Sequence, residues 1–226
     1  MSTDSSVGSK LIFRSCWRAA STWGSRRSAG RIVIGSSRPR TSPTAMEVKL
    51  AESLLPAEPE LAPRWSVAAE RMQSPAEVLT LLNRHVYNST PPEKYATLFL
   101  GLYDGEAQTF TYSNGGHLPP FLIHRSGVVR KLETGGLVIG LFPEIVLEEE
   151  KVRLAPGDIF VAFSDGITEP ENEFGEFGEE RLLELVRSNR HLTLDRISEI
   201  VIAAVQDWIG ENEQPDDVTL VLARVR

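Results

Sequence analysis

The spacing of apolar residues predicts a mixed α+β protein from residue 74 onward. Apolar positions recur at helical spacing after Ser74 and again over 179–188 and 194–208, which predicts three helices. Short apolar or alternating runs predict strands at 95–103, 108–113, 121–124, 128–132, 146–154, 159–163 and 218–222. The first four of these strands pair as two hairpins. Strands followed by two helices and a final strand favour an α+β sheet protein.

The first predicted helix has a clear start signal. Ser74-Pro75-Ala76-Glu77 is a capping box with Pro at the first helical position. We expect one apolar face on this helix, formed by Val78, Leu81, Leu82 and Val86.

The first 45 residues differ in composition from the rest of the chain. They hold eight Lys or Arg and one acid, Asp4, a net charge of +7, whereas the other 181 residues hold 16 and 30, a net charge of −14. Their 11 Ser and four Thr, without a sustained hydrophobic period, predict a disordered basic segment over residues 1–45. The Arg- and Ser-rich composition superficially matches an organelle transit peptide, but we favour an unstructured tail or a mis-assigned start region.

Residues 46–67 are expected to lead into the folded domain. A short amphipathic helix that ends at Pro56 is predicted from its apolar residues, Val48, Leu50, Leu54 and Leu55. A Pro-rich connector follows, and the domain itself is expected to occupy residues 68–226.

Composition excludes several classes of function. The 226 residues provide enough apolar content for the core of one domain, and the net charge of −7 argues against nucleic acid as the main partner. No run of 18 apolar residues predicts a membrane span. The single cysteine, Cys16, excludes an internal disulfide and fits the reducing cytoplasm.

Acidic residues stand at the ends of two apolar strands. The run at 159–163 stops at Ser164-Asp165-Gly166, and Pro215-Asp216-Asp217 leads into the run at 218–222. Carboxylates on rigid strand ends are typical ligands of Mg²⁺ or Mn²⁺, which prefer oxygen donors. A plain Asp-Gly turn is the alternative interpretation of Asp165 taken alone.

Four segments in order carry a family resemblance. They are KYATLFLGLYDGEAQTFTYSNGGHLPPFLI, GGLVIGLFP, LAPGDIFVAFSDGITEPENEFGEFGEERLLELV and PDDVTLVLARV. Over residues 74–226 the chain resembles the PPM-type metal-dependent protein phosphatases, in particular their bacterial SpoIIE-like branch. The resemblance implies an antiparallel β-sandwich flanked by helices, two Mn²⁺ or Mg²⁺ ions, and hydrolysis of phosphoserine or phosphothreonine by a metal-bound water. It also implies a role in signal transduction with a phosphoprotein substrate such as an anti-anti-sigma factor.

The same resemblance assigns roles to individual residues. Asp165 and Asp216 match the family's metal-binding aspartates, with Gly166 in the turn behind the first. Glu169 is a candidate to orient a ligand from behind. Asp217 is expected to point away from Asp216, because successive strand residues face opposite sides.

Asn114-Gly115-Gly116-His117 is the counterpart of the family's Asn-Ala-Gly-His stretch. His117 could act as an acid or phosphate donor, but holding the loop by hydrogen bonds is the interpretation we favour. Outside this stretch, Asp158 is expected to be a turn residue, and the acidic run 148–150 a solvated strand edge or turn.

The chain departs from the family pattern before Ser74. No Gly-Asp-Tyr-Tyr-Asp-like or Asp-Val-Ser-Gly-Lys-Gly-like segment is present, so the Asp that bridges the two metals in the family is missing. We therefore expect a truncated phosphatase domain in which Asp165 and Asp216 bind at most one ion weakly. Two functions stay open: a metal-dependent protein serine/threonine phosphatase, or a catalytically inactive remnant or regulatory binding module of the same fold.

Overall fold

Two β-sheets face each other in a computed structural model that describes residues 10–19, 31–35, 46–52, 74–212, 214 and 216–226. The first sheet holds β2 (Arg31–Gly35), β1 (Lys10–Ala19), β4 (Lys94–Asp104) and β5 (Thr109–Gly115), with β8 (Gly135–Gly136) and β9 (Glu150–Arg153) on β5. The second sheet runs β3 (Met46–Glu52), β13 (Thr219–Val225), β10 (Ile159–Phe163), β6 (Phe121–Ile123) and β7 (Val129–Lys131). Among these pairings only β5–β8 is parallel.

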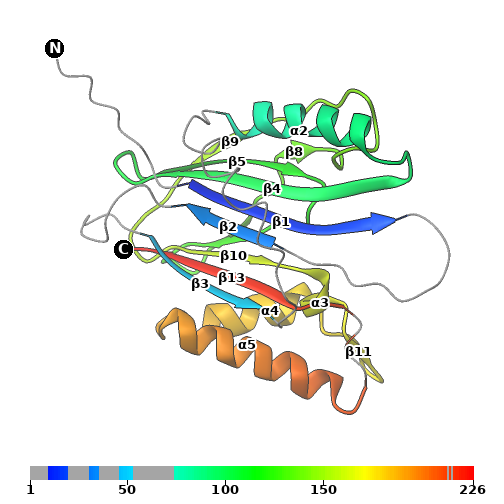
Figure 1. Cartoon of the computed structure of the whole chain (residues 1–226). Helices are drawn as coiled ribbons and strands as arrows, with labels where there is room; N and C mark the ends of the chain where they lie inside the picture. Colours follow the sequence, from blue (N-terminus) through cyan, green and yellow to red (C-terminus); the bar gives the residue numbers. More distant parts are fainter. Residues whose placement is uncertain (1–9, 20–30, 36–45, 53–73, 213, 215) are drawn as a thin grey trace.

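Helices cover the outer faces of the two sheets (Figure 1). Helix α2 (Pro75–Ser89) lies on the first sheet, and α4 (Gly178–Ser188) and α5 (Leu194–Ile209) lie under the second. Between the sheets the core is aromatic, with the rings of Phe99 and Tyr112 stacked 5.3 Å apart. This layered arrangement is the α+β fold with antiparallel sheets and outer helices expected above.

The N-terminal part of the chain differs from its expected structure. Lys10–Ala19 and Arg31–Gly35 form strands rather than a segment without structure, and β1 pairs along β4. Pairing with β4 satisfies the backbone N–H and C=O groups of β1. The Ser- and Arg-rich composition of this segment could not provide a hydrophobic core by itself. The rest of the predicted disordered segment lies outside the described residues.

The predicted linker helix is also wrong over Met46–Glu52, which is strand β3 on the edge of β13. Met46, Val48 and Leu50 alternate with other residues, a period of two that fits a strand beside an available partner. The rest of the linker, residues 53–67, lies outside the described residues, and the domain boundaries at residues 45 and 67 stay predictions.

From residue 74 the predicted helices and hairpins are confirmed, with changes in detail. Ser74 caps α2 by accepting a hydrogen bond from the Glu77 amide at 3.2 Å. The buried face of α2 is rotated from the prediction: Leu81 is 63% exposed, whereas Leu79 and Asn83 are buried. The predicted strand at 146–154 is shortened to β9, and a small hairpin of β11 (Glu171–Asn172) and β12 (Gly175–Glu176) was not predicted.

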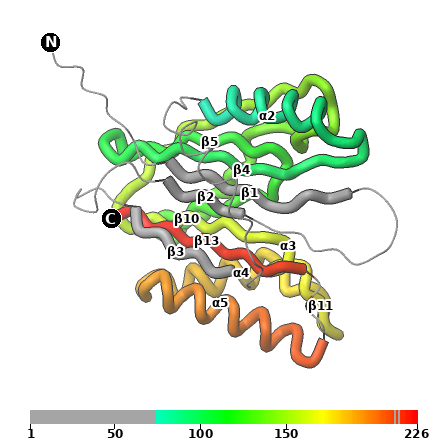
Figure 2. Tube along the Cα trace, viewed as in Figure 1, coloured from blue at the N-terminus to red at the C-terminus, as the bar shows by residue number. Residues whose placement is uncertain are grey.

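Strand register brings three chain segments to one end of the second sheet. Phe163 at the end of β10 pairs with Leu220 near the start of β13, and Val161 pairs with Phe121 at the start of β6. The loop before β6, the turn after β10 and the turn before β13 therefore meet at this end. Figure 2 shows the yellow helix α3 (Asp165–Thr168) beside the red start of β13. No helix in the described part of the chain is long and apolar enough to cross a membrane.

Candidate active site

Asp165 follows the buried strand β10 without a connecting loop. All five residues of β10 are buried, and Ser164 is the extended N-cap of the single helical turn α3. Asp165 is the first residue of that turn and is half-buried, and its Oδ1 accepts the Gly166 amide at 3.0 Å. The carboxylate therefore lies at the strand end, as the sequence predicted, but on a helical turn instead of a β-turn.

Gly166 brings this turn against the backbone of Asp216 and Asp217. A Cβ atom at Gly166 would lie 2.3 Å from the Asp217 carbonyl oxygen and 2.9 Å from that of Asp216, so only glycine fits. The two acidic turns, far apart in sequence, are thus in direct contact. The Asp216 Oδ1 accepts the Asp217 amide at 2.8 Å, and both side chains are half-buried.

Two polar side chains that the sequence analysis missed connect the same turns. The Ser164 hydroxyl donates to the Asp217 carbonyl and accepts the Thr219 amide, both at 2.9 Å. On the other side, the Gln214 amide donates to the carbonyl oxygens of Gly166 at 2.9 Å and Asp216 at 3.0 Å. Ser164 had a signal in its place just before Asp165-Gly166, whereas no pattern marks Gln214.

The Asn114–His117 segment runs from the end of β5 in the first sheet toward the start of β6 at the same end of the second sheet. The Asn114 side chain accepts the His117 amide at 2.7 Å and donates to the His117 carbonyl at 2.9 Å. Burial lowers the pKa of His117 from 6.5 to about 4, so the imidazole is neutral at pH 7. Two hydrogen bonds that hold this segment join the Asn114 side chain to the His117 backbone, and a neutral imidazole is a poor proton donor.

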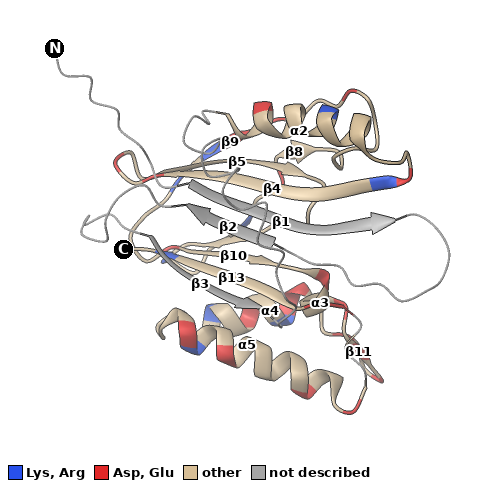
Figure 3. Cartoon of the chain, in the orientation of Figure 1, with Lys and Arg blue, Asp and Glu red and all other residues tan. Residues whose placement is uncertain are grey.

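Glu169 lies at the solvent-exposed end of α3. Its amide donates to the Asp165 carbonyl at 2.8 Å, and its side chain is exposed. Further exposed acids follow on the β11–β12 hairpin, and Figure 3 shows acidic residues around α3 and β11. This end of the molecule is therefore acidic, which suits a cation better than a free anion.

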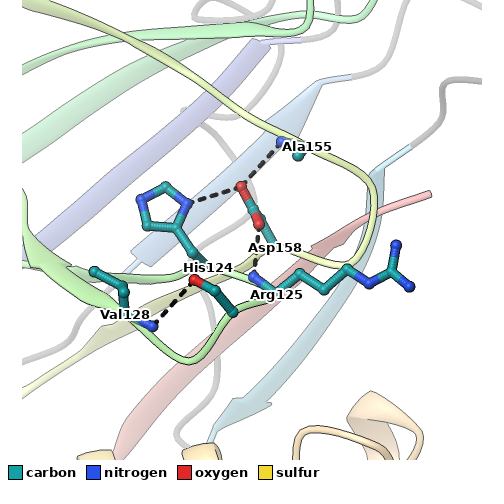
Figure 4. A network of polar contacts seen from close by, with 6 residues as sticks. His124, Arg125, Val128, Ala155 and Asp158 are labelled. Carbon is teal, nitrogen blue, oxygen red and sulfur yellow. Dashed lines mark hydrogen bonds and ion pairs between the residues drawn. The ribbon is translucent and has the colours of Figure 1, made fainter.

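Asp158 lies at the opposite end of β10, where its buried carboxylate holds a turn (Figure 4). Its oxygens accept the amides of Arg125 and Ala155, each at 2.9 Å, and one lies 3.1 Å from Nδ1 of His124. The Asp158 amide also donates to the Ala155 carbonyl, which makes it a turn residue as predicted. This network serves the fold and is not part of the acidic end.

The acidic run 148–150 is more than a solvated edge. Glu149 accepts the Ser74 hydroxyl at 2.6 Å at the start of α2. Glu150 accepts hydrogen bonds from the Tyr112 hydroxyl at 2.6 Å and from Arg130 on the other sheet. The expected solvated strand edge is confirmed, because Glu148 and Glu149 are exposed and Glu150 opens β9, which among the described strands pairs only with β5. The long-range partners of Glu149 and Glu150 leave no local pattern in the sequence.

Two of the described carboxylates at the acidic end, Asp165 and Asp216, have the donor chemistry for a divalent ion. Among the described residues, no group of three or more His, Cys, Asp or Glu side chains is arranged to hold a metal. Asp165 and Asp216 on touching turns are nevertheless hard oxygen donors, and Mg²⁺-like ions often bind one or two carboxylates and keep several waters. The described residues do not account for a bridged pair of ions.

Comparisons with known sequences identify a protein family that matches most of the chain. A family model described as stage II sporulation protein E (SpoIIE) matches residues 60–226. The chain is 30% identical over 133 residues to protein IcfG of Synechocystis sp., covering 56% of this chain and 20% of that protein. It is 29% identical over 154 residues to phosphoserine phosphatase RsbU of Bacillus subtilis, covering 66% of this chain and 45% of RsbU. The chain thus spans less than half the length of these curated relatives.

Solved structures share the fold. The SiaA-PP2C domain of Pseudomonas aeruginosa superposes with a TM-score of 0.61 at 20% identity, covering 70% of this chain and 63% of that one. The phosphatase domain of SpoIIE from Bacillus subtilis, with a fragment of its regulatory domain, gives 0.58 at 18% identity, covering 92% and 70%. With the family match over residues 60–226, the chain belongs to the SpoIIE family of PPM-type phosphatases.

Proposed function

We propose that this chain hydrolyses phosphoserine or phosphothreonine on a regulatory protein, with Mn²⁺ or Mg²⁺ as cofactor. The observation that carries the proposal is the contact between the Asp165 and Asp216 turns in a chain of this family. These two carboxylates would hold the ion, and a bound divalent ion supplies an activated water and neutralises phosphoryl charge. Gly166 permits the contact, and Asn114 fixes the nearby loop.

The substrate class rests on family resemblance. RsbU is named a phosphoserine phosphatase, which supports a phosphoserine protein as substrate. We propose a bacterial signalling protein of the anti-anti-sigma type, met in the cytoplasm, where the single Cys16 would stay reduced.

A specific observation favours a second function, that of a non-catalytic binding module. The described residues hold no group of three metal-ligating side chains, and the sequence contains no opening Gly-Asp-Tyr-Tyr-Asp-like segment. In-line attack on phosphorus requires charges fixed before the reaction begins. A chain with two carboxylates and no bridging acid would keep the family's surface without its chemistry.

A Mn²⁺ titration followed by a hydrolysis assay separates the two functions. We expect weak Mn²⁺ binding that Asp165→Asn abolishes. A phosphatase would also show slow hydrolysis of p-nitrophenyl phosphate and of a phosphoserine peptide, whereas a binding module would show none. Asp207→Asn, an exposed aspartate on α5, is the matched control and should bind Mn²⁺ like the wild type.

Robust Mn²⁺-dependent hydrolysis that is lost with Asp165→Asn would establish the phosphatase. Binding without hydrolysis supports the binding module. Binding that Asp165→Asn leaves unchanged would remove Asp165 from the site.

A further inference from the structure

We propose that Ser164 and Gln214 are positioning residues, which hold the Asp165 and Asp216 turns at the separation needed to share one divalent ion. The inference rests on the proposed function only in requiring that an ion binds there. Neither side chain needs to touch the ion, because both act on the backbone that carries the two carboxylates. We call the pair the Ser164–Gln214 clamp.

Ser164 forms the inner half of the clamp. The ladder between β10 and β13 ends at the pair Phe163–Leu220, beyond which the two chains must separate toward α3 and Asp217. The Ser164 amide still reaches the Thr219 carbonyl at 3.0 Å. Its nearly buried hydroxyl then accepts the Thr219 amide and donates to the Asp217 carbonyl. The Ser164 hydroxyl therefore replaces the next pair of backbone hydrogen bonds in the β10–β13 ladder. It fixes the points at which the two acidic turns begin.

Gln214 forms the outer half. One amide nitrogen donates to a carbonyl of each turn, that of Gly166 on the Asp165 side and that of Asp216 on the other. Both acceptors are backbone atoms next to the proposed ligands. Because Gln214 is exposed, water competes for these hydrogen bonds and their net contribution to the free energy of unfolding is small. Their geometric effect is larger, since they cross-link two segments that share no strand pairing at this point.

The close approach of Gly166 shows that the two turns held by the clamp are in tight contact. Its α-carbon faces the carbonyls of Asp216 and Asp217 so closely that a methyl group cannot enter. The clamp adds side-chain hydrogen bonds to that packing and to the backbone hydrogen bond between Ser164 and Thr219. We therefore expect a clamp variant to keep the fold and both carboxylates but to bind an ion less tightly.

The test compares Mn²⁺ affinity, from the electron paramagnetic resonance signal of free Mn²⁺, with the thermal midpoint of the metal-free protein. Gln214→Met keeps the length of the side chain but has no donor, and we expect its Mn²⁺ affinity to fall about tenfold, as for residues that orient metal ligands. Its midpoint should match that of Gln206→Met, a matched change on the exposed face of α5.

A second comparison isolates the hydroxyl at residue 164. Ser164→Ala should lose Mn²⁺ affinity, and Ser164→Thr, which keeps the hydroxyl, should recover it. Equal losses in both variants would overturn the role of the hydroxyl, because packing alone would then explain them. An unchanged Mn²⁺ affinity in Gln214→Met would overturn the role of Gln214.

The outcomes separate this inference from the proposed function. Clamp-dependent Mn²⁺ binding without any phosphatase activity supports the clamp and contradicts the proposed hydrolysis. Mn²⁺-dependent hydrolysis with wild-type affinity in the clamp variants does the reverse. Absence of Mn²⁺ binding by the wild-type chain would overturn both.

Discussion

At the scale of single residues, His117 is a buried histidine whose pKa is strongly lowered. It is 8% exposed in a loop fixed by the Asn114 side chain, and its pKa is lowered to about 4 by burial. A buried imidazole must stay neutral or pay for its desolvation. This makes the loop at the acidic end sensitive to pH.

We expect His117 to make the folded state less stable in acid. The unfolded chain takes up a proton near pH 6.5, whereas the folded chain does so only near pH 4, so stability is full above pH 6.5 and declines as the pH falls toward 4. The loss amounts to up to about 3 kcal/mol. Urea unfolding of wild type and His117→Gln from pH 7 to 4 would measure it.

His117→Gln should flatten that pH dependence, whereas His191→Gln, at an exposed position, should not. An identical pH profile for wild type and His117→Gln would show that the imidazole is not held neutral by the fold.

At the scale of elements, Glu150 connects the two sheets. From β9 it accepts a hydrogen bond from Tyr112 on β5 and pairs with Arg130 on β7 of the other sheet. The hydrogen bonds from Tyr112 and Thr134 and the Arg130 charge outweigh burial and lower the pKa of Glu150. Burial raises the pKa of Tyr112. A carboxyl group with a lowered pKa stabilises the fold above its unfolded pKa, and that stabilisation is lost as the pH falls through the folded value.

Glu150→Ala is expected to lower the free energy of unfolding by about 1–3 kcal/mol, because it leaves the buried Tyr112 hydroxyl without its acceptor. The exposed Arg130 partner adds little. Chemical denaturation of Glu150→Ala beside Glu148→Ala, a neighbouring exposed glutamate, would test this. Equal stability of the two variants would show that the Tyr112–Glu150 hydrogen bond contributes little to the free energy of unfolding.

Elements were predicted from the sequence where local period and caps agree, and missed where distant partners decide. Helix α5 and the β4–β5 hairpin follow from their own residues, whereas β3 needed β13 beside it to become a strand. The rotated face of α2 has the same origin, because Asn83 is buried to bond the Gly140 amide and the Phe142 carbonyl. No helical period predicts a buried asparagine.

The acidic end shows the same division. Asp165 and Asp216 were predicted as strand-end acids, but the contact through Gly166 and the bonds of Gln214 depend on register between β10 and β13. Register is a property of the whole sheet and cannot be read from either segment alone.

At the scale of the whole molecule, the missing family segment defines the decisive experiment. We expect a version that carries a SpoIIE-type opening segment, with its bridging Asp, to hydrolyse p-nitrophenyl phosphate with Mn²⁺ much faster than the present chain. The physical reason is that a bridging carboxylate makes a pair of neighbouring cations tolerable. Steady-state rates of both versions, each with and without Asp165→Asn, would show whether the bridging Asp allows Mn²⁺-dependent hydrolysis.

A restored version that stays inactive, although folded and able to bind Mn²⁺, would show that the opening segment is not what the chain lacks.

The position of β13 has a consequence for how the protein is made. This strand leaves the ribosome after every other described strand, yet it lies inside the second sheet, between β3 and β10. Until residues 219–225 emerge, β10 has only β6 beside it, and the Asp165 turn lacks its contact with the backbone before β13. Among the described strands β13 therefore joins the second sheet last, and a nascent chain stalled before residue 219 would display an unpaired β10 edge to chaperones.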